Sequence, residues 1–339
     1  MNRRGSRRVF GPVVSRRLGR SLGVDPVPFK TCNQNCVYCQ LGRTRNFTRR
    51  RRSFFSTTEI FSEIATSLER NRTPGVDWIT FVGSGETTLF TGLGPLIRFV
   101  RAMTEIPVAV ITNGTLLSHA AVRRELRTVN AVLTSVDAGT HELYQRINRP
   151  LPDLTLDRHI DGLVAFRDVY QGGLWVEIML VKALNDTPEA LADLVRVLHR
   201  VAPDEIHLMT PTRPPAEPWV EPPDRSILND AVAAFEKIAK VIVPGDPDRD
   251  LELDDQLDAE LDQALVDIVI RHPLRENEVR RIVERQLRAQ TSAILSELAS
   301  NERIRVVDRL GDRFWCASDS DFPDRRKDAG PTSRTVIHA

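Results

Sequence analysis

The sequence has 339 residues, of which 41% are hydrophobic and 27% charged, with a net charge of +1 and four cysteines. This length and composition predict a soluble globular protein of two domains, since one domain takes ~150 residues. No apolar run approaches the ~20 residues that cross a bilayer, and the arginine-rich start lacks the apolar core of a signal peptide. We therefore expect no membrane association and a cytoplasmic location, and so few cysteines exclude a disulfide framework.

The small net charge conceals an uneven distribution. Residues 1–52 contain thirteen arginines, one lysine and a single acid, Asp25, whereas acids concentrate in 246–261. A basic segment of this kind either meets phosphate groups, on a nucleic acid or another anionic partner, or pairs with acids elsewhere in the fold. The sequence leaves both interpretations open.

From residue 56 onward, strand and helix patterns alternate. The first helix opens with the capping-box pair Ser56 and Glu59. We expect buried strands, separated by amphipathic helices, at 77–83, 107–112, 130–136, 174–181 and 205–209. Such strands indicate a parallel sheet covered by helices. With the unit that holds the cysteines, about six strand–helix units predict an α/β fold, a partial (β/α)6 TIM-like barrel, whose functional loops follow the carboxyl ends of the strands.

The composition changes after the last of these strands. Residues 211–223 contain six prolines, which exclude regular structure, and a helical pattern at 226–242 follows. Three helices and a hairpin then predict a winged helix-turn-helix. We expect the domains to be 1–245 (the barrel with its arginine-rich start) and 256–317 (the winged helix), with a disordered tail at 318–339.

Three of the four cysteines lie close together, as Cys32-x3-Cys36-x2-Cys39. Zinc takes four ligands and an ordinary ferredoxin cluster takes four thiolates, but no second cysteine pair exists here. Three thiolates on one loop therefore indicate a [4Fe–4S] cluster with one iron open to a further ligand. The remaining Cys316 fits a buried small hydrophobic residue.

The cysteine spacing, with Tyr38 just before the third cysteine, resembles the signature of the radical S-adenosylmethionine (radical SAM) superfamily. The resemblance implies that SAM chelates the open iron. An electron from the cluster then cleaves SAM to methionine and a 5′-deoxyadenosyl radical, which abstracts hydrogen from the substrate. It further implies a flavodoxin- or ferredoxin-type electron donor, for which the basic loop 43–52 would be the docking face.

Polar and glycine-rich segments follow the expected strands, where the resemblance implies contacts with SAM. "VGSGETT" (82–88) is similar to the superfamily's glycine-rich motif, and glycine lets the backbone approach a ligand closely. The implied SAM-binding residues are Tyr38, Gly83, Gly85, Glu86, Asn113, Ser135, Leu208 and Met209. The catalytic candidates on the substrate side are Asp137 and Lys182.

Each of these loops, taken alone, also fits an ordinary turn, and Lys182 also fits a surface cation. Arg213 and Glu217 fit either the substrate mouth or an ion pair within their own loop. His207 fits either a site residue or an interior histidine.

Residues 10–44 and 209–217 further resemble Fe–S oxidoreductases related to wyosine-type tRNA synthetases. Those enzymes build a tricyclic base from a methylated guanosine in tRNA with a two-carbon unit from pyruvate. This chain departs from them in two respects: it has one spare cysteine where they carry a second cluster, and it has a C-terminal winged helix.

We therefore expect a radical SAM enzyme whose favoured substrate is nucleic acid, tRNA first, because arginines and a winged helix suit phosphate contacts. The expected recognition helix, 291–302, has no cation. A peptide or protein held by the winged helix, or a small molecule, therefore stays an alternative. A further alternative is a non-enzymatic iron–sulfur redox sensor that binds DNA, although a sensor would not need the barrel and its glycine-rich loop.

Overall fold

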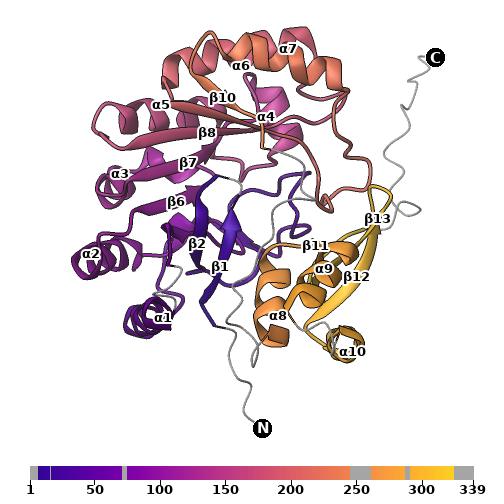
Figure 1. Ribbon diagram of the computed structural model, residues 1–339. Coiled ribbons are helices and arrows are strands. Elements are labelled where there is room, and N and C mark those ends of the chain that lie inside the picture. The colour runs from indigo at the N-terminus through magenta and orange to yellow at the C-terminus, as the bar shows by residue number, and fades with distance from the viewer. Residues whose placement is uncertain (1–6, 16, 71–74, 245–260, 287–290, 324–339) are drawn as a thin grey trace, which may run out of the picture.

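The computed structural model describes residues 7–15, 17–70, 75–244, 261–286 and 291–323. Its main element is an eight-stranded sheet in the order β1-β2-β5-β6-β7-β8-β9-β10 (Figure 1). β1 pairs antiparallel with β2, and every other neighbouring pair in this sheet is parallel. The strands are β1 (Val9–Ser15), β2 (Gly19–Val24), β5 (Trp78–Phe81), β6 (Val108–Thr112), β7 (Ala131–Ser135), β8 (Gly173–Met179), β9 (Glu205–Met209) and β10 (Lys240–Ile242).

Helices cover the outer face of the curved sheet (Figure 1). They begin where the sequence signals predict: Ser56 Oγ accepts the Glu59 N–H at 3.3 Å before α1, and Thr187 caps α6 ahead of Pro188. The helical elements of the barrel are α1 (Thr57–Arg70), η1 (Thr87–Leu89), α2 (Leu93–Met103), η2 (Thr115–Ser118), α3 (Ala120–Leu126), α4 (His141–Ile147), α5 (Leu156–Arg167), α6 (Pro188–Val201) and α7 (Arg225–Phe235). A two-stranded sheet of β3 (Thr31–Cys32) and β4 (Asn46–Phe47) flanks the cysteines.

Side chains alternate along each strand between the helix-covered core and the lumen enclosed by the sheet. On β8, Val176 and Ile178 belong to the outer core, whereas Trp175 and Met179 point inward. Trp175 meets Trp78 edge-on, with ring centroids 6.0 Å apart, at the amino-terminal end of the strands. The lumen is therefore filled at that end and has space toward the carboxyl ends.

The predicted partial barrel of six strand–helix units is confirmed, with one further strand at each edge. The segment 226–242, which we expected to be one helix, is helical only to Phe235 and then forms β10. Lys240 and Ile242 pair with Glu205 and His207 of β9, so backbone pairing at the sheet edge replaces the last helical turns.

Residues 261–286 and 291–323 form a second unit, here called the C-terminal module. Its three-stranded antiparallel sheet has the order β11-β13-β12, and its apolar side chains make a separate core. This element order is that of the predicted winged helix, and the assignment to that class stays a prediction. The elements are α8 (Leu261–Arg271), β11 (Leu274–Arg275), α9 (Glu276–Gln286), α10 (Thr291–Ser300), β12 (Ile304–Arg309) and β13 (Asp312–Ala317).

The predicted domain limits fall partly on residues that the structure does not describe, including the acidic linker at 245–260. The expectation of a disordered tail from residue 318 is wrong for 318–323. Asp321 forms a parallel bridge with Gly42, and its carbonyl accepts the Arg43 N–H at 2.9 Å. The tail residues 324–339 lie outside the described part. Among the described helices, none is long and apolar enough to cross a membrane.

Candidate functional site

The cysteine loop, residues 30–42, follows β2 at the carboxyl ends of the parallel strands. Backbone hydrogen bonds fix it from two sides: the Val37 N–H donates to the Ile147 carbonyl and the Glu217 N–H donates to the Val37 carbonyl, both at 2.9 Å. The Glu86 N–H donates to the Thr31 carbonyl at the same distance. The loop is therefore held by α4, by the proline-rich loop and by the glycine-rich loop.

Each of the three half-buried sulfur atoms in this loop has an N–H donor. Cys32 Sγ lies 3.5 Å from the Gln34 backbone nitrogen and 3.7 Å from Asn113 Nδ2. Cys36 Sγ lies 3.6 Å from Asn148 Nδ2. Hydrogen bonds from N–H groups to sulfur are typical of the cysteine thiolates that hold iron–sulfur clusters.

The donor to Cys39 is Lys30, whose Nζ lies 3.0 Å from Cys39 Sγ. The Lys30 side chain is buried, and its backbone has a φ of 53°. Burial alone would lower the pKa of this ammonium group, but Cys39 and Cys32 outweigh that effect and raise it. Lys30 therefore places a fixed positive charge beside the thiolates.

The three cysteines suit a cluster better than a single metal ion. All are free of disulfides. Within the described ranges, no group of three or more histidine, cysteine or acidic side chains converges on one ion position. The sulfur atoms of thiolates on one zinc ion must lie within about 4 Å of one another. The thiolates of a cluster each bind a separate iron, so their sulfur atoms lie further apart. In the metal-free protein, burial and then Glu86 raise the pKa of Cys32 to about 11, so iron must displace a proton from it.

The glycine-rich loop after β5 lies directly against the cysteine loop. A Cβ atom on Gly85 would lie 1.9 Å from the Thr31 carbonyl oxygen, so only glycine fits there. Gly83 also sits tightly, because a Cβ atom on it would lie 2.8 Å from Val27 Cγ2. Ser84 ties the two loops together, because its carbonyl accepts the Lys30 N–H at 2.7 Å.

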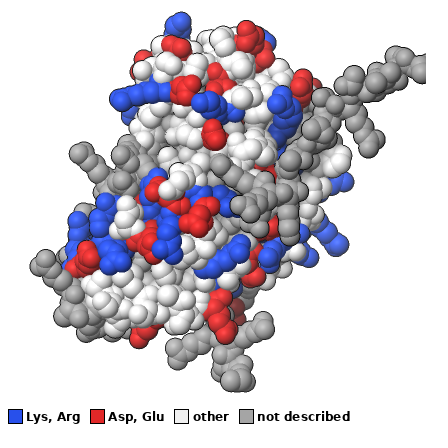
Figure 2. Space-filling view, turned by 90° about the vertical axis from the view of Figure 1, so that its right-hand side faces the viewer, with Lys and Arg blue, Asp and Glu red and all other residues white. Residues whose placement is uncertain are grey.

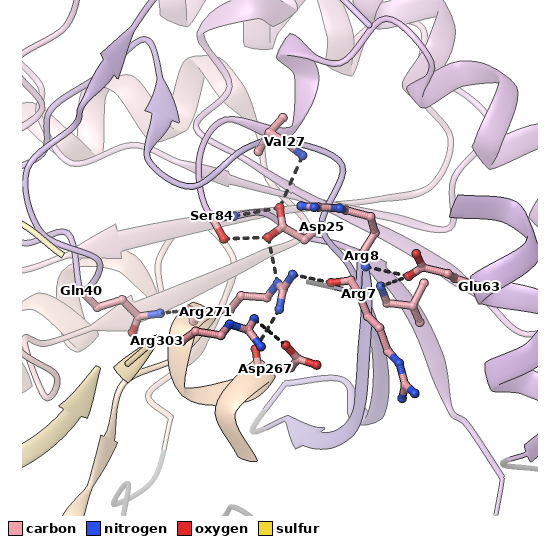
Figure 3. A network of polar contacts seen from close by, with 11 residues as sticks. Arg7, Arg8, Asp25, Val27, Gln40, Glu63, Ser84, Asp267, Arg271 and Arg303 are labelled. Carbon is pink, nitrogen blue, oxygen red and sulfur yellow. Dashed lines mark hydrogen bonds and ion pairs between the residues drawn. The ribbon is translucent and has the colours of Figure 1, made fainter. Parts of the chain in front are cut away.

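Asp25, at the end of β2, organises the same place (Figure 3). Its Oδ1 accepts the Ser84 N–H at 3.0 Å and its Oδ2 accepts the Ser84 hydroxyl at 2.6 Å. Arg271 of α8 completes the group, with Nε 2.8 Å from Asp25 Oδ2. The glycine-rich loop is thus bound to β2 and to the C-terminal module through one buried carboxylate.

Glu86 uses its side chain to join two strand ends. The carboxylate accepts hydrogen bonds from the Thr112 hydroxyl at 2.6 Å and from the Asn113 N–H at 2.7 Å. The Asn113 side chain in turn donates to Asn33 Oδ1 at 2.7 Å, beside Cys32. The structure therefore brings Glu86 and Asn113 together next to the cysteine loop.

Asp137, expected to be catalytic, is a buried acceptor at the centre of a hydrogen-bond group. The Tyr38 hydroxyl donates to it at 2.5 Å, Asn148 Nδ2 at 2.6 Å and the Met179 N–H at 2.8 Å. Burial raises the pKa of Asp137, and these three donors oppose the shift. Asp137 links the cysteine loop, α4 and β8, and Tyr38 belongs to this group.

The structure bears on the interpretations left open for three polar residues; Arg213, for one, lines the lumen, as the substrate-mouth interpretation has it. Lys182 is half-exposed and pairs with Asp224 at 2.9 Å, so its cation does not point at the cysteine loop. Arg213 and Glu217 do not pair with each other. Arg213 binds Glu278 in α9, whereas Glu217 binds Arg43 and Arg149. These partners lie 65, 174 and 68 positions away in the chain, so the local proline-rich loop gave no sign of them.

The remaining candidates surround the lumen. Ser135 ends β7 on the inward face, and Met209 ends β9 and lines the lumen, whereas the Leu208 side chain packs in the outer core. His207 is buried, stacks on Trp175 at 5.4 Å and has its pKa lowered by burial. It fits the interior-histidine interpretation. Cys316 is buried, as predicted.

A cavity of about 400 Å³ occupies the upper lumen and reaches the cysteine loop. Tyr38, Cys39 and Gln40 form the end nearest the cysteines, and Gly83 lies beside them. Deeper in the lumen the wall carries the ion pair between Arg17 and Glu177. One of the three cysteines, Cys39, thus faces an internal space large enough for a small ligand.

The basic loop 43–52 is less positive than its sequence indicates. Four of its arginines pair with acids from other parts of the fold: Arg43 with Glu217, Arg45 with Asp319, Arg49 with Asp153 and Arg51 with Glu125. On the face of the molecule drawn in Figure 2, basic side chains lie among acidic ones. The interpretation of intramolecular pairing holds for these residues.

The sequence did not single out Lys30 and Asn148, which donate to the sulfur atoms, or Ser84, which joins the cysteine loop to the glycine-rich loop. Lys30 did carry a signal, because it is the one lysine among thirteen arginines in residues 1–52 and stands two positions before Cys32. Asn148 carried none, since it reaches Cys36 from 112 positions away.

Comparison with known proteins agrees with this geometry. Residues 27–195 match the family described as the radical SAM superfamily. The chain is 38% identical over 229 residues to UPF0026 protein MJ1312 of Methanocaldococcus jannaschii, covering 68% of this chain and 71% of that protein. It is also 42% identical over 208 residues to a protein named GTPase Obg of Brachyspira hyodysenteriae. That match covers 61% of this chain and spans only 30% of the Brachyspira protein.

Solved structures were compared with the chain, and one of them shares the fold at low sequence identity. Streptococcus suis SuiB bound to S-adenosylmethionine is similar with a TM-score of 0.50 and 16% identity, over 66% of this chain and 50% of that one. TYW1 with a lysine–pyruvate adduct has a TM-score of 0.44 and 14% identity, over 88% of this chain and 80% of that one. At these levels the likeness concerns the fold and not the substrate.

Proposed function

Because the chain belongs to the radical SAM superfamily, we propose that it is an enzyme that cleaves SAM reductively at a [4Fe–4S] cluster and acts on a substrate held in the barrel lumen. Cys32, Cys36 and Cys39 would hold the cluster. The observation that carries this proposal is the position of Cys39, which belongs both to a loop whose sulfur atoms have N–H donors and to the wall of the lumen cavity.

When bound, the cluster supplies the electron that breaks the sulfonium bond of SAM and releases the 5′-deoxyadenosyl radical. The chain's own residues would bind and orient SAM and the substrate, and would exclude water from the site. Lys30 compensates negative charge beside Cys39. The close packing of Gly85 against the Thr31 carbonyl holds the glycine-rich loop beside the cysteine loop, where the superfamily resemblance implies backbone contacts with SAM at Gly83, Gly85 and Glu86.

The other SAM contacts remain proposals that fit their positions. Asn113 lies beside Cys32, Ser135 faces inward at the end of β7, and the backbone at Leu208 and Met209 ends β9. Asp137 acts as a positioning residue, because its carboxylate is bound by Tyr38, Asn148 and β8.

We propose a flavodoxin- or ferredoxin-type protein as the source of the electron. The tRNA substrate favoured by the sequence has less support, because four arginines of the loop 43–52 have acid partners. α10, the expected recognition helix, has no cation. The geometry supports a substrate, or a single residue of a larger one, that fits within the lumen.

The test is an anaerobic assay with the reconstituted protein, dithionite and SAM, in which 5′-deoxyadenosine is measured by chromatography. We expect wild-type protein to form it and Cys36→Ala to lose both the cluster absorbance and the product. Addition of bulk tRNA should leave the rate unchanged, whereas a strong stimulation would restore tRNA as the substrate. A fully loaded cluster that forms no 5′-deoxyadenosine would refute the proposed activity.

A further inference from the structure

The barrel has an open side, because its edge strands β1 and β10 lie at opposite ends of the sheet order and do not pair with each other. The C-terminal module lies beside β1 at this side of the barrel (Figure 1). The lumen cavity is lined from both sides of the opening and from the module itself. These lining residues are Phe10 and Val13 from β1, Thr210 to Arg213 and Pro244 from the other edge, and Ile268, Arg271 and His272 from the module.

We propose that the C-terminal module is the wall that closes the substrate cavity, and that the substrate is a metabolite-sized molecule with a largely apolar body and a polar end. The inference rests on the proposed function, which makes the cavity the substrate site. In this role the module completes the cavity of its own chain and needs no further partner.

The first support is a buried anchor between the module and β2. Arg271 and Asp25 are both almost fully buried, and their charged atoms lie 2.8 Å apart. Arg271 also donates to the Arg7 carbonyl at 2.7 Å (Figure 3). Its guanidinium lies 5.0 Å from the centre of the Phe10 ring. Removing either partner would leave a buried charge, so this contact holds the module in one position.

The second support is an independent anchor at the opposite edge of the opening. Arg213, in the loop after β9, makes a bidentate pair with Glu278 of α9, and both side chains are buried. Arg275 donates to the Thr212 carbonyl at 3.3 Å. The module therefore binds both edges of the open sheet and spans the gap between them.

The third support is one face of α8. The His272 N–H donates to the Ile268 carbonyl at 2.7 Å, so the two residues lie one helical turn apart on the same side. Both line the cavity, and Gln40 Nε2 lies 3.3 Å from His272 Nδ1. The module thus reaches the residue that follows Cys39.

The size and lining of the cavity indicate the class of substrate. SAM and the substrate would share this space of about 400 Å³, which suits a small molecule and cannot admit a folded macromolecule. Apolar surface dominates the wall, from side chains such as Ile111, Met179 and Met209. Polar groups lie at two places on it: Arg17 with Glu177 deep in the lumen, and Gln40, Arg271 and His272 beside the cysteine loop. A largely apolar body with a polar end matches this arrangement.

The experiment uses cluster-loaded protein without reductant and with saturating SAM, so that SAM stays intact and fills its own part of the cavity. The probe is 8-anilinonaphthalene-1-sulfonate, which has an apolar body and an anionic end, titrated by calorimetry. We expect one probe molecule per chain. His272→Trp, from the module, and Thr210→Trp, from the opposite edge, should each weaken binding about tenfold or more, because both fill the cavity.

Ala293→Trp, on the exposed face of α10, is the matched control and should leave binding within about twofold. If circular dichroism shows that His272→Trp does not fold, Ile268→Phe on the same face of α8 replaces it. Binding that Thr210→Trp abolishes and the folded module variant leaves unchanged would overturn the module as a wall. Absence of saturable probe binding to the wild-type protein would overturn the substrate class.

The same titration with bulk tRNA separates the macromolecular alternative. Tight tRNA binding that His272→Trp weakens would overturn the metabolite-sized substrate in favour of nucleic acid. Probe binding does not depend on SAM cleavage. A protein that binds the probe as expected but forms no 5′-deoxyadenosine would refute the proposed activity and leave the role of the module intact.

Discussion

Replacement of Glu278 by glutamine tests how firmly the module is fixed to the barrel. Arg213 and Glu278 are 6% and 3% exposed, so the substitution leaves a guanidinium buried without its countercharge. Breaking such a pair costs about 3–5 kcal/mol in the free energy of unfolding. Because Arg213 also lines the cavity, water can reach part of it, and we expect the lower end, about 3 kcal/mol.

A second variant separates two contributions of the same side chain. Glu278 also accepts the Arg275 N–H at 2.5 Å, which is the backward hydrogen bond of a helix capping box at the start of α9. Glutamine keeps an oxygen for this bond, whereas alanine does not. Glu278→Ala should therefore lose about 1 kcal/mol more than Glu278→Gln. The double variant Arg213→Met with Glu278→Leu should recover much of the loss, because apolar side chains can replace a buried pair.

The assay is urea unfolding followed by tryptophan fluorescence, with Asp161→Asn as the control. Asp161 pairs with Arg200 at 2.8 Å on the exposed surface, and the loss there should stay below about 1 kcal/mol. A Glu278→Gln protein as stable as the Asp161→Asn protein would refute the buried anchor. In the Glu278→Gln protein, amide hydrogen exchange in α9 and at Thr212 and Arg213 should rise together if the anchor works as described.

Three further predictions concern the site and its surroundings. Lys30→Met should lower the cluster's reduction potential by on the order of 100 mV in a redox titration followed by electron paramagnetic resonance, whereas Lys182→Met should leave the potential unchanged. The reason is that a charge ~5 Å away contributes ~3 kcal/mol, and for a one-electron step 1.4 kcal/mol corresponds to ~59 mV. Gly85→Ala should weaken SAM binding at least ~10-fold in equilibrium dialysis, because the new Cβ would meet the Thr31 carbonyl. Gly311→Ala has open space but a φ of 83°, so it should cost some stability and leave SAM binding unchanged. Burial lowers the pKa of His159 to about 4, so as the pH falls below ~6.5 the unfolded chain takes up a proton before the folded chain does. The free energy of unfolding of the wild-type protein should therefore drop by roughly 3 kcal/mol by pH 4, compared with that of the His159→Leu protein.

The sequence predicted those parts of the fold that depend on local patterns. The strand at 205–209 ends where the structure ends it, because an apolar run followed by a polar and proline-rich segment marks a buried strand. β10 was missed because three residues at a sheet edge gain their structure from β9 and not from their own periodicity. α4 was missed for a related reason, since it has only seven residues.

The residues of the candidate site likewise fall into those that a local sequence pattern predicts and those that it does not. The spacing of cysteines and glycines that follow strands are local patterns, so Cys32, Cys36, Cys39 and Gly85 could be singled out in advance. The use of a polar side chain depends on partners that are distant in sequence. Asp137, for example, is proposed as a positioning residue because Tyr38, 99 positions away, donates to it.

Arginine enrichment shows how this affects functional inference. A guanidinium binds a phosphate and a carboxylate with the same planar geometry, so composition alone cannot separate a nucleic-acid surface from an intramolecular pair. The partners decide: Arg271 is held by Asp25 and Arg213 by Glu278, and each pair would have to break before a phosphate could bind. The cost of that exchange is the same few kcal/mol that fixes the module to the barrel. These two arginines line the proposed substrate cavity with guanidinium groups already paired to carboxylates, so they hold the module in place and are not available to bind a phosphate.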